Sequence, residues 1–257
     1  MARPVDLARR VEGACLNGWP ALRQVWFDGW LLRFSEGHTR RSNSVTPVAP
    51  SRRDLRDKIA YCEALYASAG LPLIVRVPTM AETGLDAGLD ALGYAAEDET
   101  CVIYRDLDGS LPEHGDAELS EGMPSEAWLD AHARFTGNAA SGHSVQRKIL
   151  AALAVPAVFA AARTADGRMG SVAFGAVHDR IVCLNLVATD PAVRRQGLSR
   201  RTVSALLAWA QEAGAAAACL PVVASNAPAI ALYRQLGFDT ELYRYHYRRR
   251  GEPRPQA

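Results

Sequence analysis

The sequence lacks several features that would assign it at once to a class of function. Its formal net charge is only +1 over 257 residues, so no overall field attracts nucleic acid or an anionic membrane. No apolar run approaches the ~18 residues that span a bilayer, and the N-terminus lacks the apolar stretch of a signal peptide. We therefore expect a cytoplasmic protein with neither a membrane nor a nucleic-acid partner.

Paired cysteines are also missing. The five cysteines are Cys15, Cys62, Cys101, Cys183 and Cys219. They are odd in number and form no C-x-x-C pair, which predicts neither a disulfide framework nor a zinc site, and we expect no metal. The interpretation adopted for all five is that they are small buried apolar side chains.

Lysine is nearly absent too, at Lys58 and Lys148 alone, so almost every basic side chain is an arginine.

Hydrophobic periodicity predicts an α/β fold. In the first half we expect helices at 4–16, 51–68 and 83–92, with Ser51 as a helix cap, a pair of strands at 26–34 around Asp28-Gly29, and strands at 44–50, 73–77 and 100–105. In the second half we expect helices at 124–134, 144–153, 198–213 and 227–236, and strands at 157–163, 168–177, 181–189, 217–223 and 241–248. Residues 106–116, rich in Gly, Pro and acid, predict a linker, and 249–257 a frayed tail.

The two halves of the chain repeat one pattern. A helix, a strand, a helix ending in L-G-[YF] and a further strand follow in the same order at 51–105 and at 198–248. Helix-glycine-strand units are common, but four elements in register favour an internal duplication. We therefore expect two similar sub-domains, over residues 1–110 and 111–257.

The most basic loop of the chain reads TDPAVRRQGLSRR, over residues 189–201. It lies between an apolar strand and an amphipathic helix, so it borders a helix N-terminus, where about four N–H groups lack partners. Gly197 lets the backbone approach a ligand, and Arg194, Arg195 and Arg200 surround the opening with charge. A pyrophosphate fits such a site, while a solvated arginine-rich loop is the alternative. Neither a Walker motif nor G-x-G-x-x-G is present.

Two motifs in this region resemble those of the GNAT superfamily of acyl-CoA-dependent N-acyltransferases. RRQGLS at 194–199 is similar to [QR]-x-x-G-x-[GA], with Ser199 as a departure, and NAPAIALYRQLGF at 226–238 is similar to N-x-x-A-x-x-L-Y-x-x-L-G-F. The resemblance covers residues 118–248, and the whole chain resembles tandem-domain members. It implies an α/β fold with a mixed sheet, in two tandem GNAT-like domains. The first half resembles a degenerate copy, because it lacks the loop motif and has Leu89 where the second motif has its tyrosine. That departure implies that the first half neither binds coenzyme A nor catalyses.

The resemblance implies acetyl-CoA as co-substrate and assigns residues to it. The expected cofactor-binding residues are Val187, Ala188 and Thr189 for the pantetheine arm, Arg194, Arg195, Gln196, Gly197, Leu198 and Ser199 for the pyrophosphate, and Asn226 near the pantetheine. A backbone N–H of the strand segment would also polarise the thioester carbonyl. Asn226 has a second interpretation, as the N-cap of a helix that begins before Pro228.

Tyr233 is the expected catalytic residue, as the general acid that protonates the departing thiolate; a core tyrosine is the alternative. No general base stands out, because the strand before the loop offers only Cys183 and Asn185. A water relay is preferred, and the weaker candidates are Glu36, His38, His143 and His178. Cys183 as an acyl-carrying nucleophile is disfavoured without an adjacent histidine. The polar run EGHTRRSNS at 36–44 either reaches a substrate cleft between the halves or is a solvated loop.

These expectations define an N-acetyltransferase. It would transfer an acetyl group from acetyl-CoA to a primary amine of a small molecule, by direct attack in a ternary complex, as a monomer or homodimer. Protein or peptide N-termini are alternative acceptors. A different alternative is a non-catalytic acyl-CoA-binding sensor or interaction module, which the lack of an evident base favours and Tyr233 disfavours. Nucleic-acid binding through the arginines is disfavoured by the neutral overall charge.

Overall fold

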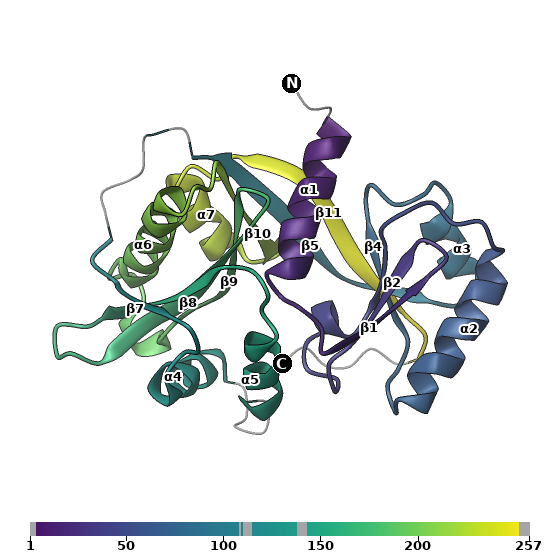
Figure 1. Ribbon diagram of the computed structural model, residues 1–257, viewed down its shortest axis with the longest axis horizontal. Coiled ribbons are helices and arrows are strands. Elements are labelled where there is room, and N and C mark those ends of the chain that lie inside the picture. The colour runs from purple at the N-terminus through teal and green to yellow at the C-terminus, as the bar shows by residue number, and fades with distance from the viewer. Residues whose placement is uncertain (1–3, 108, 110–114, 138–142, 252–257) are drawn as a thin grey trace.

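The computed structural model describes residues 4–107, 109, 115–137 and 143–251 (Figure 1). Its strands are β1 (Arg23–Phe27), β2 (Trp30–Phe34), β3 (Val45–Pro47), β4 (Ile74–Pro78), β5 (Ala95–Asp106), β6 (Glu118–Glu121), β7 (Ala157–Arg163), β8 (Met169–His178), β9 (Ile181–Thr189), β10 (Ala217–Val223) and β11 (Thr240–Arg249). Its helices are α1 (Pro4–Asn17), α2 (Leu55–Ser68), α3 (Leu85–Ala91), α4 (Glu126–Thr136), α5 (His143–Ala151), α6 (Leu198–Glu212) and α7 (Ala227–Gln235). The predicted α/β fold with a mixed sheet is confirmed.

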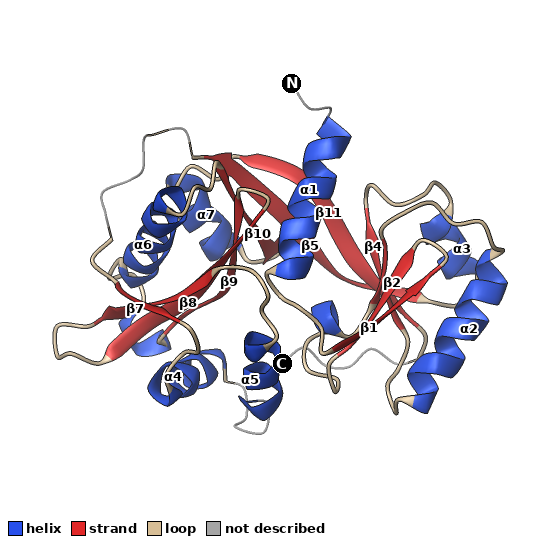
Figure 2. Ribbon diagram, viewed as in Figure 1, coloured by secondary structure: helices blue, strands red, loops and turns tan. Residues whose placement is uncertain are grey.

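All the strands belong to one sheet of eleven, in the order β1-β2-β3-β4-β11-β5-β10-β9-β8-β7-β6. Along β7 the side chains alternate between two cores, as a strand with both faces covered requires. Val158 and Ala160 pack with α6 and α7, while Phe159 and Ala161 pack with α4 and α5. Figure 2 shows these helix pairs on opposite sides of the strands. Helix α1 covers β8, β9 and β10.

The two halves of the chain exchange strands. The last strand, β11, lies between β4 and β5 and is antiparallel to both, and β5 pairs on its other side with β10. Each half therefore completes the sheet of the other, and Figure 1 shows β5 and β11 running from one half of the molecule to the other. The division into 1–110 and 111–257 stays a prediction about the chain, and the sheet itself is continuous across it.

The predicted repeat has a local counterpart in the structure. Helices α3 and α7 both end at a glycine in the left-handed region, with φ of +82° and +81°. In each helix the residue after the glycine donates its amide to a carbonyl of the last turn. Tyr94 donates to Leu89 after α3, and Phe238 donates to Tyr233 after α7, both at 3.0 Å. The two turns are thus the same helix-ending motif. This correspondence supports the predicted duplication.

Most predicted elements are present, and two details differ. Helix α2 begins at Leu55, and Asp54 caps it by accepting from the amide of Arg56 at 2.8 Å. Ser51, predicted as that cap, instead donates its hydroxyl to Glu82 at 2.8 Å. Strand β6 was not predicted, because its four residues are all exposed and show no alternation. Much of the predicted linker, at 108 and 110–114, and of the tail, at 252–257, lies outside the described residues.

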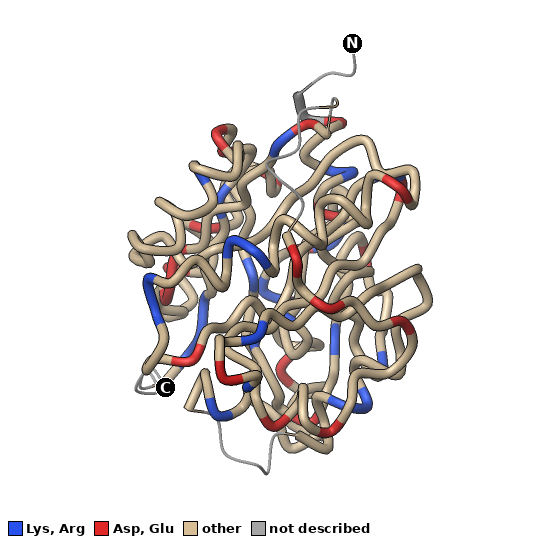
Figure 3. Tube along the Cα trace, turned by 90° about the vertical axis from the view of Figure 1, so that its left-hand side faces the viewer, with Lys and Arg blue, Asp and Glu red and all other residues tan. Residues whose placement is uncertain are grey.

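Charge is mixed along the fold. Figure 3 shows basic and acidic positions interspersed along the trace on the side that it presents. Among the helices in the described parts of the chain, none combines the length and apolar character needed to cross a membrane.

Candidate active site

A cavity opens where β9 and β10 stop pairing. The two strands run parallel in register from Ile181 and Ala217 to Cys183 and Cys219, and beyond that pair they diverge. The space between them is a cavity of about 250 Å³. Its lining is Arg41, Leu184, Asn185, Leu186, Val187, Leu220, Pro221, Val222, Val223, Asn226, Ala229 and Tyr233. The site is therefore a notch in the middle of the sheet, walled by two strands and by α7.

The β9 wall of this cavity carries a β-bulge. Leu186 has a φ of +52°, and the register with β8 shifts so that neither Leu186 nor Val187 has a partner residue there. A β-bulge removes backbone N–H and C=O groups from the hydrogen bonds between the paired strands and changes the direction in which they point. Because β10 has already diverged on the other side, the backbone of this segment is free to bind an extended ligand or a carbonyl oxygen.

The basic loop between β9 and α6 is held in an uncommon backbone conformation. Arg195 has a φ of +64°, and Gly197, which immediately precedes α6, has a φ of +76°. A Cβ added at Gly197 would meet no atom within 4 Å. Glycine is therefore favoured at this position by the backbone angle and not by a lack of space. The hydroxyls of Ser199 and Thr189 are hydrogen-bonded to each other. That bond fixes the start of α6 against the end of β9.

Three of the four arginines in this loop have no side-chain partner among the described residues. Arg194, Arg195 and Arg200 are exposed, and within the described residues they make no ion pair or hydrogen bond through their side chains. Arg201, by contrast, donates to Asp116, with one of the two bonds at 2.8 Å. The result is three uncompensated cations beside a helix N-terminus, an arrangement that attracts a multiply charged anion.

The predicted cofactor-binding residues differ in what they can offer. Val187 and Asn226 line the cavity. Ala188 and Leu198 are buried in the core, with 7% and 3% of their surface exposed, so only their backbone groups are available to a ligand. Gln196 is exposed in the loop.

Asn226 takes the second of its two predicted interpretations and also borders the cavity. Its side chain accepts from the amide of Ala229 at 3.2 Å, which makes it the N-cap of α7. The cap fixes the start of the helix that carries Tyr233, seven residues or about two turns further along. Both interpretations of Asn226 are therefore compatible.

Tyr233 is both a core residue and part of the cavity wall. Only 6% of it is exposed, and its ring packs edge-on against Phe238 with centroids 6.0 Å apart. Within the described residues its hydroxyl has no hydrogen-bond partner. Burial raises the pKa of Tyr233 above that of a free tyrosine, because a phenolate would lose its hydration. The hydroxyl therefore keeps its proton at neutral pH and can donate it.

Two of the candidate bases lie outside the cavity lining and contact other parts of the chain. Glu36 forms an ion pair with Lys148 at 2.7 Å, and both side chains are about half exposed. His178, at the end of β8, lies against Gly13 of α1. Neither residue lines the cavity.

The other two candidates belong to a group of three histidines. Burial, followed by the charge of His143, lowers the pKa of His38 below its usual value. His143 lies 3.6 Å from Asp130 through Nδ1. His132, which the sequence gave no reason to single out, is buried in α4, and burial and the charges of the other two lower its pKa to about 4. His38 and His132 are therefore neutral at pH 7.

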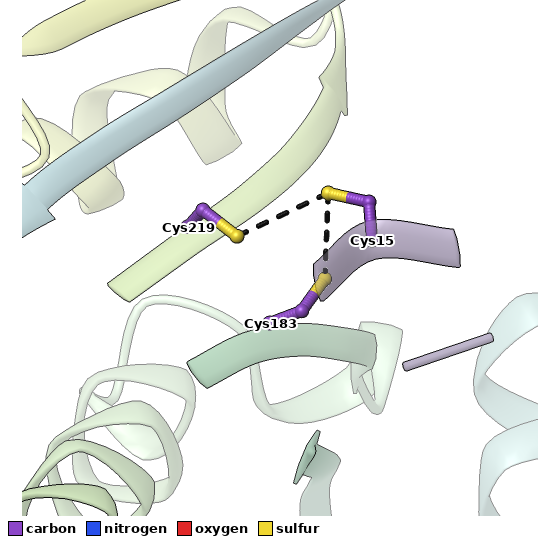
Figure 4. A group of neighbouring side chains, drawn as sticks. All are labelled: Cys15, Cys183 and Cys219. Carbon is purple, nitrogen blue, oxygen red and sulfur yellow. Dashed lines mark hydrogen bonds between the residues drawn. The ribbon is translucent and has the colours of Figure 1, made fainter. Parts of the chain in front are cut away.

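Three of the five cysteines meet in the core beneath the cavity (Figure 4). The Sγ of Cys15 in α1 lies 3.7 Å from that of Cys183 in β9 and 3.9 Å from that of Cys219 in β10. The three sulfurs lie within 4.8 Å of one another, a spacing that metal-ligating thiolates share. Sequence spacing did not indicate this convergence, because Cys15 and Cys219 are 204 positions apart. Cys183 points toward Cys15 and does not line the cavity.

All five cysteines are free and buried, as predicted. The thiols of the group at Cys15, Cys183 and Cys219 lie among apolar side chains of α1, β9, β10 and β11. In these contacts they behave as small core groups.

The first half of the chain contributes one residue to the cavity lining, Arg41. The polar run 36–44 was predicted either to reach a cleft or to be solvated, and the position of Arg41 supports the first interpretation. Trp19 anchors the run, because its ring NH donates to the Thr39 hydroxyl at 3.0 Å and its ring lies 6.4 Å from that of His38. The sequence did not single out Arg41 among its neighbours.

Comparisons with known proteins agree with this geometry. The family model described as "Probable histone acetyltransferase Rv0428c C-terminal" matches residues 7–250. The uncharacterized N-acetyltransferase YobR of Bacillus subtilis is 27% identical over 95% of this chain and 99% of its own length. The [ribosomal protein bS18]-alanine N-acetyltransferase of Escherichia coli K12 is 39% identical, over 33% of this chain and 57% of its own.

Solved structures share the fold. A GCN5-related N-acetyltransferase from Kribbella flavida superposes with a TM-score of 0.66 at 17% identity, over 98% of this chain and 97% of that one. A tandem GNAT protein from the clavulanic acid biosynthesis pathway superposes with a TM-score of 0.62 at 16% identity, over 82% of this chain and 76% of that one. At these identities the likeness concerns the fold alone.

Proposed function

The chain belongs to the GNAT N-acetyltransferases, in the family of the probable histone acetyltransferase Rv0428c C-terminal region, and we propose that it transfers the acetyl group of acetyl-CoA to a primary amine of a small molecule. The observation that carries the proposal is the cavity between the diverging strands β9 and β10. It has a bulged strand on one wall and a buried, proton-bearing tyrosine on another.

The residues around the cavity suit the parts of acetyl-CoA in turn. The backbone of Val187, Ala188 and Thr189 would pair with the pantetheine arm as an additional strand does. The amides of residues 196–199, with the side chains of Arg194 and Arg195, would hold the pyrophosphate. The absence of any partner for these arginine side chains within the described residues supports this assignment.

The reaction is a direct attack in a ternary complex. Acetyl-CoA supplies the acetyl group as a thioester, and the amine nitrogen forms the new C–N bond at the carbonyl carbon while the C–S bond breaks. A backbone N–H of the segment at Val187 stabilises the charge that develops on the carbonyl oxygen. Tyr233 donates its proton to the departing sulfur. The proton that the amine loses leaves through a water relay.

The acceptor is the least constrained part of the proposal. A small-molecule amine is the first candidate. The similarity to an acetyltransferase that acts on a ribosomal protein alanine favours a protein N-terminus as the second. A panel of small amines and peptides with a free N-terminal alanine, assayed by coenzyme A release, separates the two. Acetyl-CoA binding without release for any amine would favour the sensor alternative.

Replacing Gly197 tests the assigned pyrophosphate site. Gly197→Glu places a negative side chain where three arginines are unpaired, at a φ that side chains rarely adopt. We expect the affinity for acetyl-CoA to fall at least about 100-fold, as measured by isothermal titration calorimetry. Repulsion of the pyrophosphate and distortion of the loop both act in this direction.

Gly214 provides the matched control for this variant. It follows the other end of α6, has a φ of +82°, and a Cβ added there would also meet no atom within 4 Å. Gly214→Glu therefore introduces the same charge and the same backbone strain away from the loop. Acetyl-CoA affinity should remain that of the wild type. Unchanged affinity in Gly197→Glu would show that the pyrophosphate binds elsewhere.

A further inference from the structure

Arg41 brings a guanidinium from the first half of the chain into the wall of the cavity. Its Nη1 is buried and has no hydrogen-bond partner. Within the described residues no carboxylate lies within ion-pair distance of Arg41, whereas the adjacent Arg40 pairs with Glu97 at 3.1 Å and also with Asp98. A buried charged donor without an acceptor is costly, and such groups usually mark a site where a ligand supplies the acceptor.

The surroundings of Arg41 carry more positive than negative charge. Arg33 is buried beside it and donates to the Arg41 carbonyl at 2.9 Å and to two further carbonyls, all of them uncharged. Arg76 is buried too, and it shares the one nearby buried carboxylate, Glu12, with Tyr243. Burial, followed by the charges of Arg41 and Arg76, lowers the pKa of Arg33 to about 10. The charges of Arg33 and Arg41 thus have no carboxylate of their own.

Arg41 lies toward the floor of the cavity. It lines the cavity together with Leu184 and Asn185, the residues of β9 that immediately follow the last pair with β10. Its charge also acts on Cys183 below the floor. The loop before α6, where the pyrophosphate is proposed to bind, follows the opposite end of β9. Arg41 is therefore placed for the acceptor end of the ternary complex.

We propose that Arg41 binds a carboxylate of the acceptor, so that the enzyme preferentially acetylates amines that also carry an acidic group. This inference rests on the proposed function. A guanidinium and a carboxylate match in a bidentate geometry, which fixes direction as well as adding affinity. Arg41 would hold the acceptor at its acidic end and leave the amine free to face the thioester. Asn185, a buried residue of the cavity lining, also has a polar atom without a hydrogen-bond partner among the described residues, its Oδ1. This oxygen would accept a hydrogen bond from the ammonium or amine N–H of the same molecule.

Matched pairs of acceptors test this inference. Free amino acids and their carboxamides differ only in the group that Arg41 would bind, and both are assayed by coenzyme A release. We expect Arg41→Gln to lower kcat/KM for the amino acids by about 10- to 100-fold relative to the amides, which is the loss of a charged hydrogen-bonded pair. The ratio between variants cancels the different basicity of the two amines. The KM for acetyl-CoA should not change.

Arg40→Gln is the control, because it removes the same charge from the neighbouring position but breaks a pair that already exists with Glu97 and Asp98. It should preserve the preference for amino acids. Arg41→Lys keeps the charge but loses the two parallel N–H donors of the guanidinium. It should therefore retain part of the preference for amino acids. If Arg41→Gln instead raises the KM for acetyl-CoA and alters both acceptors equally, Arg41 binds the cofactor and the inference is wrong.

A binding measurement covers the case in which none of these amines turns over. In the presence of coenzyme A, an N-acetylamino acid should bind the wild type by calorimetry, and its carboxamide should bind more weakly. Arg41→Gln should remove that difference. Two results would overturn the inference and leave the proposed function standing. One is equal binding of the acid and the amide, and the other is binding of coenzyme A without binding of either compound. Failure of coenzyme A to bind would overturn the proposed function instead.

Discussion

At the scale of single residues, Tyr233 lies both in the core and in the cavity wall, so its position is compatible with each of the two alternatives that its sequence context left open. Its ring belongs to the core cluster formed by α6, α7 and the sheet, and its side chain also lines the cavity. A core tyrosine normally finds an acceptor for its hydroxyl, since an unsatisfied buried donor costs about 1–3 kcal/mol. The hydroxyl of Tyr233 has none among the described residues. The hydroxyl is not among the fully buried polar atoms that lack a partner, so it is open to the cavity and available to a ligand there.

Tyr233→Phe should lower kcat by about 100-fold or more while leaving acetyl-CoA affinity unchanged, because only the proton donor is lost and the ring still packs. The raised pKa of Tyr233 keeps the wild-type acid protonated through neutral and mildly alkaline pH. The difference between the two enzymes should therefore persist across that range. Steady-state rates and calorimetry at several pH values provide the measurement.

Tyr94 is a suitable control for that variant. It follows the equivalent turn in the first half, is buried, and donates its hydroxyl to Glu63 at 2.6 Å. Tyr94→Phe removes a buried hydroxyl from outside the cavity, so turnover should match the wild type. Equal kcat for Tyr233→Phe and the wild type at every pH would exclude Tyr233 as the acid.

Residues within continuous motifs could be predicted from the sequence, and residues brought together by folding could not. The loop before α6 and Tyr233 lie in motifs with fixed spacing, and the cavity lies beside them. Arg41 and His132 have no such pattern: Arg41 is one of two arginines in a polar run, and His132 is one histidine on an amphipathic helix. The placement of Arg41 beside β9 and of His132 near His38 depends on contacts between segments more than ninety positions apart, which periodicity does not encode.

At the scale of elements, α1 is anchored to the sheet by a buried ionic group. Glu12 is 6% exposed and accepts from both terminal nitrogens of Arg76 in β4, one of them at 3.0 Å, and from the hydroxyl of Tyr243 in β11. One turn further along the same face, α1 supplies Cys15 to the group with Cys183 and Cys219. Helix α1 thus contacts strands from both halves of the chain.

Glu12→Gln should lower the free energy of unfolding at pH 7 by about 3–5 kcal/mol, because it leaves the buried Arg76 without its counter-charge. Urea-induced unfolding measures this loss. As a control, Glu118→Gln removes an exposed carboxylate that pairs with Arg163 on the surface, and its effect should be close to zero. A similarly small effect for Glu12→Gln would show that α1 is held by apolar packing alone.

The pH dependence of this stabilisation follows from the direction of the shift. The contacts with Arg76 outweigh burial and lower the pKa of Glu12 in the folded protein. Its contribution is therefore complete above the unfolded value of about 4.3 and is lost as the pH falls through the lower folded value. The stability difference between wild type and Glu12→Gln should accordingly be constant near neutral pH and shrink below about pH 4.

Element positions along the chain were largely predictable, and their order in the sheet was not. Strands β7, β9 and β10 begin and end where their apolar patterns predict. The partners of β11 could not be inferred, because an alternating pattern fixes which side chains are buried and not which strand lies alongside. Strand β6, with four exposed residues, has no pattern to detect and exists through its pairing with β7.

At the scale of the whole molecule, the strand exchange couples the two halves. The contacts of β11 with β4 and β5 continue in side-chain contacts, since Arg248 at its far end bonds Asp86 and Asp90 of α3 in the first half. The cavity is also shared, because Arg41 from the first half lines it together with residues of β9, β10 and α7 from the second. A family model that matches residues 7–250 as one unit is consistent with this coupling.

We therefore predict that residues 1–110 and 111–257, produced as separate chains, do not fold independently. The first would lack β11, which leaves β4 paired on one side only, with β3, and β5 without either of its neighbours, and the second would lose β5 from beside β10. Each would expose unpaired strand edges and apolar core. Circular dichroism and urea titration should show no cooperative transition for either fragment alone, whereas equimolar mixing should restore one, together with acetyl-CoA binding. A cooperative transition of residues 1–110 alone would mean that the first half needs no strand from the second, and the exchanged sheet would then not be what stabilises it.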